Sequence, residues 1–262
     1  MKSNINLLFK AFIILFFSCT NSHSQDVLKV AVVGLSHDHA HGIMHEFKNK
    51  KVIILGIVET DIALVKRYQN SYAIPSSLFY NDLEEMLKEI KPDAVLAFNP
   101  ISEHVDVARI CLPLKIPVMV EKPLATTLKD AQEMAKLSRD NHTLLLTNYE
   151  TTWYGSNQTL KNEVSKSDFG TIKKMIAKDG HNGPKEIGCS KEFLNWLTDP
   201  EKNGGGAIVD FGCYGANLMT WLQDGEKPIA VTAITRNFKP NVYPKVDDDA
   251  TIILEYKKAT GI

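Results

Sequence analysis

The sequence has few cysteines, no excess of charge of one sign and no apolar run long enough to cross a membrane. Its 4 cysteines in 262 residues are irregularly spaced, which is typical neither of a disulfide framework nor of a cysteine-based metal site. The net charge of −1 and the pI of about 6.7 argue against binding to nucleic acid, and we expect no such partner. What is present, 44% apolar and 23% charged residues, is typical of a globular protein with one large or two modest domains.

The first 25 residues differ from the rest in composition. The apolar run Ala11–Phe17 follows two lysines and is too short to span a bilayer. The small residues Ser22 and Ser24 come after it, and this layout is typical of a secretory signal peptide cleaved after Ser24. A lipoprotein-type cleavage that leaves a lipid on Cys19 is the alternative, and membrane association is expected only in that case. We predict an exported protein, periplasmic or secreted, with residues 1–25 as its signal peptide.

Short apolar runs alternate with helical patterns from residue 28 to 148. Turns of a few polar residues, glycines and prolines separate them. Because a strand, a helix and a further strand connect with a right-handed crossover, this alternation predicts a doubly wound, mainly parallel sheet. The first domain is therefore expected to be a dinucleotide-binding Rossmann domain over residues 26–148. The predicted strands cover 28–33, 52–58, 94–98, 118–120 and 143–147.

The turn after the first strand is where a dinucleotide-binding domain carries G-x-G-x-x-G. Here the sequence is Gly34-Leu35-Ser36-His37-Asp38-His39, so only the first glycine is present. Ser36 is small enough to let a pyrophosphate approach the backbone, and we predict Gly34, Ser36 and His37 as cofactor contacts. Glu59 follows the second strand, where a carboxylate can accept both ribose hydroxyls and repel a 2′-phosphate. NAD is therefore favoured over NADP.

Lys122 follows the apolar strand Val118–Val120 in the motif Glu121-Lys122-Pro123. Pro123 cannot donate a ladder hydrogen bond, so the strand ends there and Lys122 lies at its carboxyl end, where open α/β sheets bind ligands. A lysine held partly out of water can transfer a proton or hold a substrate hydroxyl. On these residues alone, a surface lysine at a strand end is the simpler interpretation.

Three glycines, Gly204–Gly206, precede a helical pattern that contains Asp210 and Tyr214. Residues four apart project from one helical face, so the carboxylate and the phenol are expected side by side. Together with Lys122 they would form an acid–base group. The alternative is that Asp210 is a helix-start carboxylate and that Tyr214 only packs.

Other candidate ligand residues lie in the second half of the chain. Tyr149 and Trp153 mark the predicted domain boundary, and their rings suit either a sugar or the packing of a domain interface. His181 lies in a glycine-rich loop that can present it to a pocket, and Asn217 follows Tyr214 on the same helical pattern. The acidic turn 247–249 is interpreted as solvated rather than metal-binding.

Gly34 after a strand, Asn99-Pro100 followed by His104, and Glu121-Lys122-Pro123 together resemble the Gfo/Idh/MocA family of NAD(P)-dependent sugar and polyol oxidoreductases. The resemblance implies a second α/β domain over residues 149–262, with an open, mostly antiparallel sheet that binds substrate and mediates homo-oligomerisation. The chain stops directly after a strand, so we expect this sheet to be incomplete. The cofactor contacts implied on the nicotinamide side are Asn99, Pro100, His104, Glu121 and Lys122.

The resemblance also implies a catalytic group of Lys122, Asp210 and Tyr214. Family members carry an Asp at this place and usually a His four residues later. Tyr214 departs from that majority and is similar to glucose–fructose oxidoreductase and dihydrodiol dehydrogenase. Tyr214 would exchange the hydroxyl proton with help from Lys122, whose pKa a nicotinamide cation would lower. Asp210 would orient a carbohydrate substrate, with Tyr149, Trp153, His181 and Asn217 as further substrate contacts.

Three other functions stay open from the sequence. An NAD-dependent glycosidase or epimerase would use the same residues. A noncatalytic sugar- or cofactor-binding relative would explain the reduced glycine motif. A metal-dependent hydrolase could use His37, His39 and His41, since imidazoles suit zinc, but the barrel that carries such sites needs eight β/α units and the chain has too few. Export adds the hypothesis of a tightly held cofactor that is recycled within each catalytic cycle.

Overall fold

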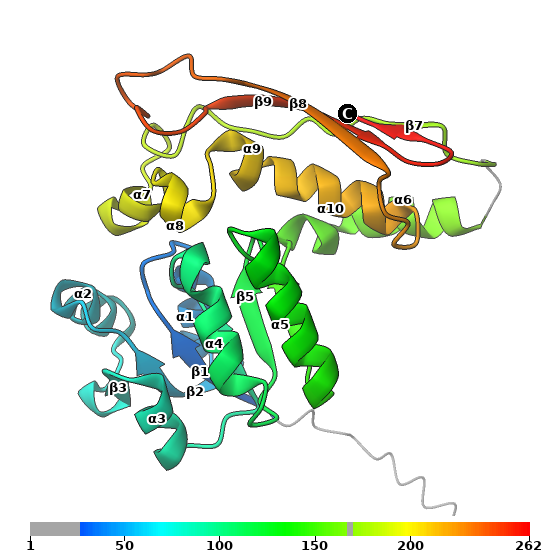
Figure 1. Ribbon diagram of the computed structural model, residues 1–262. Helices are drawn as coiled ribbons and strands as arrows, with labels where there is room; N and C mark the ends of the chain where they lie inside the picture. Colours follow the sequence, from blue (N-terminus) through cyan, green and yellow to red (C-terminus); the bar gives the residue numbers. More distant parts are fainter. Residues whose placement is uncertain (1–26, 167–169) are drawn as a thin grey trace, which may run out of the picture.

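The computed structural model describes residues 27–166 and 170–262, which form two lobes (Figure 1). The predicted signal peptide and Cys19 lie outside the described residues. The lower lobe in Figure 1 contains a six-stranded sheet, and the upper lobe contains a smaller, four-stranded sheet. A layer of helices, from α7 (Lys191–Leu197) to α10 (Gly212–Leu222), lies between the two sheets (Figure 1).

The first sheet has the strand order β3-β2-β1-β4-β5-β6, and every pair of neighbours in it is parallel. This is the predicted doubly wound arrangement, in which the strand order reverses between β1 and β4. Its strands are β1 (Leu28–Val33), β2 (Val52–Val58), β3 (Phe79–Tyr80), β4 (Ala94–Ala97), β5 (Val118–Glu121) and β6 (Leu145–Asn148). Its helices are α1 (Ala40–Lys48), α2 (Ile62–Tyr72), α3 (Leu83–Glu89), α4 (His104–Cys111) and α5 (Leu128–Asn141).

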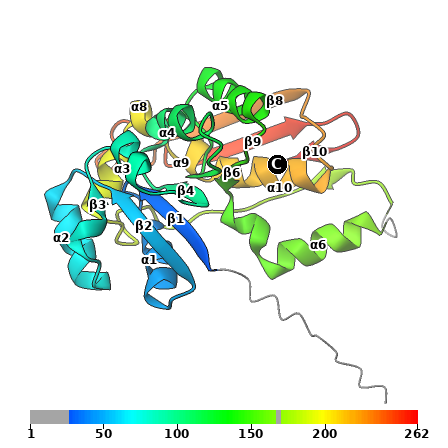
Figure 2. The same ribbon diagram turned by 90° about the horizontal axis from the view of Figure 1, so that it is seen from below.

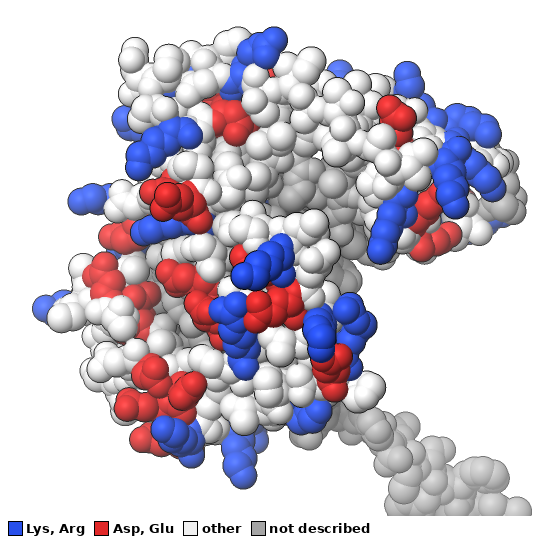
Figure 3. All heavy atoms as spheres, in the orientation of Figure 1, with Lys and Arg blue, Asp and Glu red and all other residues white. Residues whose placement is uncertain are grey.

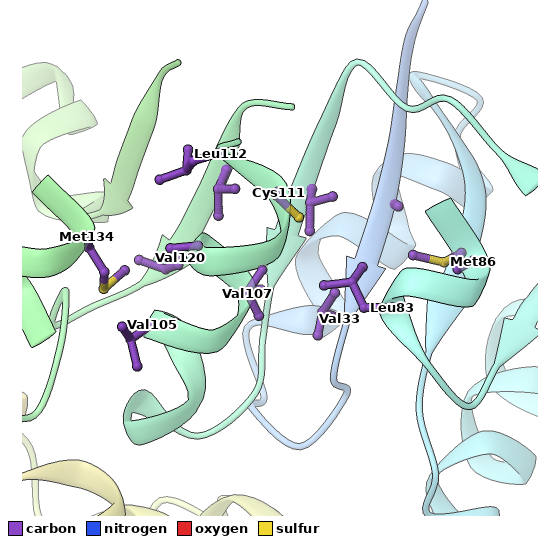
Figure 4. Close-up of a cluster of buried hydrophobic side chains, with 14 residues drawn as sticks. Val33, Leu83, Met86, Val105, Val107, Cys111, Leu112, Val120 and Met134 are labelled. Carbon is purple, nitrogen blue, oxygen red and sulfur yellow. The ribbon is translucent and has the colours of Figure 1, made fainter. Parts of the chain in front are cut away.

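Helices cover both faces of this sheet, which is why its strands are apolar on both sides. Seen from below, α1 and α2 lie on one side and α3, α4 and α5 on the other (Figure 2). Figure 4 shows the second of these two cores, where Val33 and Val120 from the sheet meet Met86, Val107 and Met134 from the helices. The opposite core includes Val30, Ile57, Met44 and Tyr68. Two cores of this kind hold the strand ends, and therefore the site, at fixed positions.

The second sheet has the order β7-β10-β9-β8, with two antiparallel pairs and one parallel pair. It is thus mostly antiparallel, as predicted. Its strands are β7 (Lys174–Met175), β8 (Ala230–Arg236), β9 (Asp249–Glu255) and β10 (Thr260–Gly261), and its helices are α6 (Gly155–Ser165), α7 (Lys191–Leu197), α8 (Pro200–Asn203), α9 (Ala207–Asp210) and α10 (Gly212–Leu222). Short 3-10 turns are η1 (Ser76–Leu78), η2 (Ile101–Glu103) and η3 (Glu150–Trp153).

Three local predictions for the second half are wrong. The helix expected to carry both Asp210 and Tyr214 is interrupted at Phe211, which separates α9 from α10. The apolar residues that interrupt polar positions over 171–178 predict a strand along that stretch, but only Lys174–Met175 forms one. The acidic turn is not simply solvated, because its carboxylates accept backbone N–H groups: Asp247 from Gly206 (3.0 Å) and Ile208 (2.7 Å), and Asp248 from Phe238 (2.7 Å) and Lys239 (2.7 Å).

Acidic and basic side chains are interspersed over the lower lobe of the face shown in Figure 3. This agrees with the near-zero net charge of the sequence. No helix within the described ranges combines the length and apolarity that a membrane crossing requires.

Candidate active site

Lys122 lies where the two lobes meet. It follows the last residue of β5, and its side chain is 6% exposed. Its ammonium group contacts the carboxylate of Asp210, at the end of α9, and donates to the Asp210 backbone oxygen at 3.2 Å. A strand end of the first domain and a short helix of the second are thereby joined through one buried ion pair.

The Asp210 carboxylate keeps Lys122 charged. Burial alone lowers the pKa of the ammonium group, because a low-dielectric surrounding disfavours charge. Burial is the largest single cause, but the attraction and hydrogen bond of Asp210, together with the charge of Glu121 and the nearby Cys213, outweigh it, so the net shift raises the pKa of Lys122 above its ordinary value. Lys122 is therefore a hydrogen-bond donor in this form of the protein, and it can release a proton readily only when another positive charge approaches.

Tyr214 completes the predicted catalytic group despite the helix break before it. The Lys122 Nζ lies 5.0 Å from the centroid of the Tyr214 ring, and Tyr214 is 5% exposed. Burial, with the nearby carboxylate of Glu150 as a further cause, raises the pKa of the phenol. Tyr214 thus holds its proton and can donate it to an oxygen atom that binds beside Lys122.

Glu121 is fully buried beneath this group. One carboxylate oxygen accepts the side-chain amide of Asn148 at 2.8 Å, and the other lies 3.0 Å from Nδ1 of His39. The second oxygen also accepts the backbone N–H of Lys122 at 3.3 Å. The Glu121 carboxylate thus joins β6, the turn after β1 and the Lys122 backbone at one buried point.

The turn after β1 fits the close approach of a dinucleotide. Gly34 has φ +78°, and a Cβ atom there would lie 2.7 Å from Cβ of Asn99. Asn99 is buried, and its side-chain oxygen is without a hydrogen-bond partner among the described residues. A free buried acceptor beside a turn that only glycine can form is what a bound nucleotide amide or hydroxyl would satisfy.

The remaining predicted cofactor contacts have different surroundings. The Glu59 carboxylate accepts the backbone N–H of Leu35 at 2.8 Å, so it lies against the turn after β1 and keeps free lone pairs for ribose hydroxyls. Pro100 directly precedes the turn η2. His104 is fully buried, with Nδ1 3.2 Å from the Leu124 backbone oxygen, and burial lowers its pKa to about 4. His104 therefore supports the turn after β5 as a neutral ring.

Helix α7 covers the turn after β1. Trp196 donates from Nε1 to Oγ of Ser36 at 3.1 Å, although 160 residues separate them. The rings of Phe193 and Trp196 lie 4.3 and 5.4 Å from that of His37, measured between centroids. The second domain thus forms one wall of the predicted phosphate site.

The predicted histidine cluster is divided in two. His41 faces α2, where its Nδ1 lies 2.7 Å from the Tyr72 hydroxyl. His37 and His39 instead face Glu121, with possible ligand atoms of the three residues within 4.8 Å of one another. They do not fit a metal ion well, because Nδ1 of His37 accepts the backbone N–H of His39 at 3.1 Å. The neutral His37 ring then carries its proton on Nε2, the atom that faces Glu121.

A cavity of about 720 Å³ opens on the second-domain side of Asp210. Phe211 and His181 also line it, and their rings meet edge-on with centroids 4.8 Å apart. The glycine-rich loop thus brings His181 to the same cavity as Asp210. This is the hollow in which a substrate bound at Asp210 can be accommodated.

The other predicted substrate contacts lie elsewhere. Tyr149 and Asn217 line a separate hollow of about 520 Å³, and Asn217 donates to the Thr152 hydroxyl at 2.7 Å. The rings of Tyr149 and Tyr214 meet edge-on, with their centroids 6.4 Å apart. Trp153 is 69% exposed, so it does not pack in a domain interface of this chain.

The sequence interpretation missed Asn148, Glu150 and Trp196. Asn148 pairs with Glu121 across β5 and β6, and aligning the two predicted strands by their ends would have found it. Glu150 follows two residues later, and its negative charge contributes to raising the pKa of Tyr214 and that of His39. No sequence signal identifies the contact of Trp196 with Ser36, since an apolar helix predicts only burial.

Two stretches of the chain match described protein domains. Residues 28–149 match the Gfo/Idh/MocA oxidoreductase family domain with an NAD-binding Rossmann fold, and residues 157–262 match the Gfo/Idh/MocA C-terminal domain. Trans-1,2-dihydrobenzene-1,2-diol dehydrogenase of Xenopus laevis is 28% identical over 208 residues, which are 78% of this chain and 57% of that protein. The chain thus spans less than two thirds of the length of this relative.

Solved structures show the same fold. An oxidoreductase from Agrobacterium radiobacter, in complex with NAD+, L-tartaric acid and magnesium, superposes with a TM-score of 0.74 at 22% identity, covering 90% of this chain and 65% of that one. Myo-inositol 2-dehydrogenase from Lactobacillus plantarum gives a TM-score of 0.72 at 21% identity, covering 89% and 68%.

Proposed function

Because the chain belongs to the Gfo/Idh/MocA oxidoreductase family, we propose that it transfers hydride between a nicotinamide cofactor and a hydroxyl-bearing carbon of a sugar, polyol or glycoside. The observation that carries the proposal is the meeting of Lys122 with Asp210 and Tyr214 at the junction of the two domains. Lys122 follows a strand end of the dinucleotide-binding domain, and its partner Asp210 lines the cavity of about 720 Å³ in the second domain.

Each residue of the group has a role in that chemistry. Lys122 donates a hydrogen bond to the substrate oxygen, and Tyr214 exchanges the hydroxyl proton with it. Asp210 orients the substrate and balances the charge of Lys122. The nicotinamide, when bound, would accept or donate the hydride. The Gly34 turn, Asn99 and Glu121 would hold the cofactor.

NAD is the cofactor that Glu59 favours. Its carboxylate lies against the turn after β1, where it can accept two ribose hydroxyls and would repel the 2′-phosphate of NADP.

The pattern of the first 25 residues supports export. An exported enzyme has no free NAD pool, so the cofactor would have to stay bound and be reduced and reoxidised within each cycle. Trp196 and Phe193, which cover the turn after β1, support such retention. Epimerisation and oxidation-dependent glycoside cleavage are the net reactions compatible with a recycled cofactor.

Exposed apolar side chains on β8 support the predicted homo-oligomer. Val231 and Ile234 are 64% and 53% exposed and lie on opposite faces of β8, since successive strand residues alternate between faces; exposed apolar side chains of this kind are typical of protein contacts.

The first experiment is to express the full chain, denature it and identify any released nucleotide by mass. Isothermal titration of NAD+ and of NADP+ into nucleotide-free protein then gives the two affinities. Hydride transfer is followed at the reduced-nicotinamide absorbance near ~340 nm with a panel of sugars, polyols and glycosides. Protein that neither carries nor binds a nicotinamide nucleotide refutes the proposal. NAD+ binding without hydride transfer to any tested carbohydrate would favour a noncatalytic relative.

A further inference from the structure

The turn between β1 and α1 has few backbone donors left for an anion. In a dinucleotide-binding domain this turn and the first helical turn offer free N–H groups to the pyrophosphate. Here most of them already have acceptors within the protein. Leu35 donates to Glu59 (2.8 Å), His37 to the Phe98 oxygen (3.0 Å), His39 to His37 (3.1 Å), Ala40 to the His37 oxygen (3.0 Å), His41 to the Asp38 oxygen (3.1 Å) and Gly42 to the His39 oxygen (2.9 Å).

His37 offers a side-chain donor in their place. Its Nδ1 accepts the His39 backbone N–H, so its proton is on Nε2. The ring is 1% exposed, and Nε2 lies 3.8 Å from the Glu121 carboxylate, which is too long for a hydrogen bond. Burial lowers the pKa of His37 well below its ordinary value. His37 is therefore a neutral ring with a fixed and unused N–H group.

His39 offers a second donor, and this one is charged. It occupies the place of the last glycine of the motif, directly before α1. Its Nδ1 lies 3.0 Å from the Glu121 carboxylate, and its side chain is 34% exposed. Burial lowers the pKa of His39, but the hydrogen bond and the charge of Glu121 outweigh it, so the net pKa is raised. The proton of His39 thus offsets the buried carboxylate.

The other charged groups around His39 do not replace that proton. Lys122 is paired with Asp210, and the carboxylate of Glu150 faces His39 from η3 and adds negative charge. His104, which lies behind His37, is neutral. Without the proton on His39, an incoming pyrophosphate would meet the negative charges of Glu121 and Glu150 with little compensation.

We propose that His37 and His39 bind the pyrophosphate of the dinucleotide through their ring N–H groups, in place of the missing glycines, and that the His39–Glu121 pair makes this binding weaken as pH rises. The inference rests on the proposed function, because it concerns the same cofactor. It gives a role to His37 and His39, which take no part in the catalytic group.

The test is the dissociation constant of NAD+ for the full chain, measured by calorimetry between pH 6 and pH 9. The Kd is expected to rise about tenfold over this range, as the charge-assisted hydrogen bond of His39 is lost. Adenosine, which lacks the pyrophosphate, is expected to bind with no such dependence.

Two variants and one control assign the effect. His39→Gln should bind NAD+ weakly at every pH, with the slope gone. His37→Phe should weaken binding at every pH and keep the slope. His45→Gln, an exposed histidine on α1, should behave as the wild type.

The outcomes separate the two claims. A wild-type protein that binds NAD+ with no pH slope, or a His39→Gln variant that keeps the slope, overturns this inference and leaves the proposed function intact. Stoichiometric zinc in the purified protein, lost in both histidine variants, also overturns it. Absence of NAD+ binding at every pH overturns both claims.

Discussion

The two halves of the site are built differently. The first domain contributes buried polar groups at the ends of parallel strands: Glu121 and His104 are 0% exposed, and Lys122 and Asn99 are 6% exposed. The second domain contributes Asp210, at the end of a four-residue helix, and His181, on an exposed loop. The cofactor half is therefore fixed by the sheet, whereas the substrate half can change with little cost to the first domain.

Removing the strand-end cation is expected to have the largest effect. Lys122→Met should lower kcat about a thousandfold, because it removes a proton-transfer partner, while the Kd for NAD+ changes little. The stability of the second domain should also fall, since Asp210 would be left as an unpaired, mostly buried carboxylate. The measurements are kcat from nicotinamide absorbance and a thermal melt. Lys136→Met, at an exposed ion pair on α5, is the control, and equal losses in both variants would refute a specific role.

Removing the second-domain partner should have a smaller effect with a distinct pH signature. Asp210→Asn is expected to lower kcat about a hundredfold. Without the carboxylate, burial dominates and the pKa of Lys122 falls. The limb of the pH–rate profile on which oxidation rises with pH should therefore move to lower pH. Asp224→Asn, which changes the exposed partner of Lys161, should leave the profile in place. An unmoved limb in Asp210→Asn would show that Lys122 does not control it.

Glycine substitutions test the rigidity of the cofactor half. Gly34→Ala places a Cβ 2.7 Å from Asn99 at φ +78°, so the free energy of unfolding should fall by about 1–3 kcal/mol. The Kd for NAD+ should rise more than about tenfold, since 1.4 kcal/mol corresponds to that factor. Gly42→Ala in α1, where nothing lies within 4 Å of the added Cβ, should instead stabilise the protein by about 0.5–1 kcal/mol. If the two variants had the same stability and the same affinity for NAD+, the turn at Gly34 would not be crowded as the structure shows it.

The smallest effect concerns the loop that carries His181. Lys239 and Tyr243 bind Glu186 and lower its pKa from 4.5 to about 2. A lowered carboxylate pKa stabilises the folded state above pH 4.5, and that contribution is lost as pH falls toward 2. The melting temperature of Glu186→Gln should therefore lie below that of the wild type at pH 7 and approach it near pH 2. Glu163→Gln, at a surface pair, should show no such convergence.

Much of the first domain could be predicted from the sequence. Apolar runs and helix-start residues are local signals: Asp61 caps α2 through the N–H of Ala63 at 2.7 Å, and Asp82 and Thr127 cap α3 and α5 in the same way. The break at Phe211 could not be predicted, because it accompanies contacts of Gly206 and Ile208 with Asp247, far along the chain.

The candidate site, like the fold, could be predicted only in part, because some of its contacts are not local in sequence. Lys122, Asp210 and Tyr214 were expected together from the family resemblance, and the structure brings them together. Their arrangement depends on tertiary contacts instead of the helical spacing that the sequence suggested. Tyr149 and Asn217 were expected at the substrate and line another hollow, where Asn217 is held by its hydrogen bond to the Thr152 hydroxyl.

The contact between Asp247 and the start of α9 has a consequence for synthesis on the ribosome. A Cβ at Gly206 would lie 1.9 Å from the Asp247 backbone oxygen, so the two segments are closely fitted and the position of Asp210 depends on a residue 37 positions later. The first sheet, in contrast, is complete at Asn148. Domains generally fold in order of emergence, so the nascent chain can form the turn after β1 well before Asp210 is in place. A nucleotide bound early would then be present when the second domain folds over it.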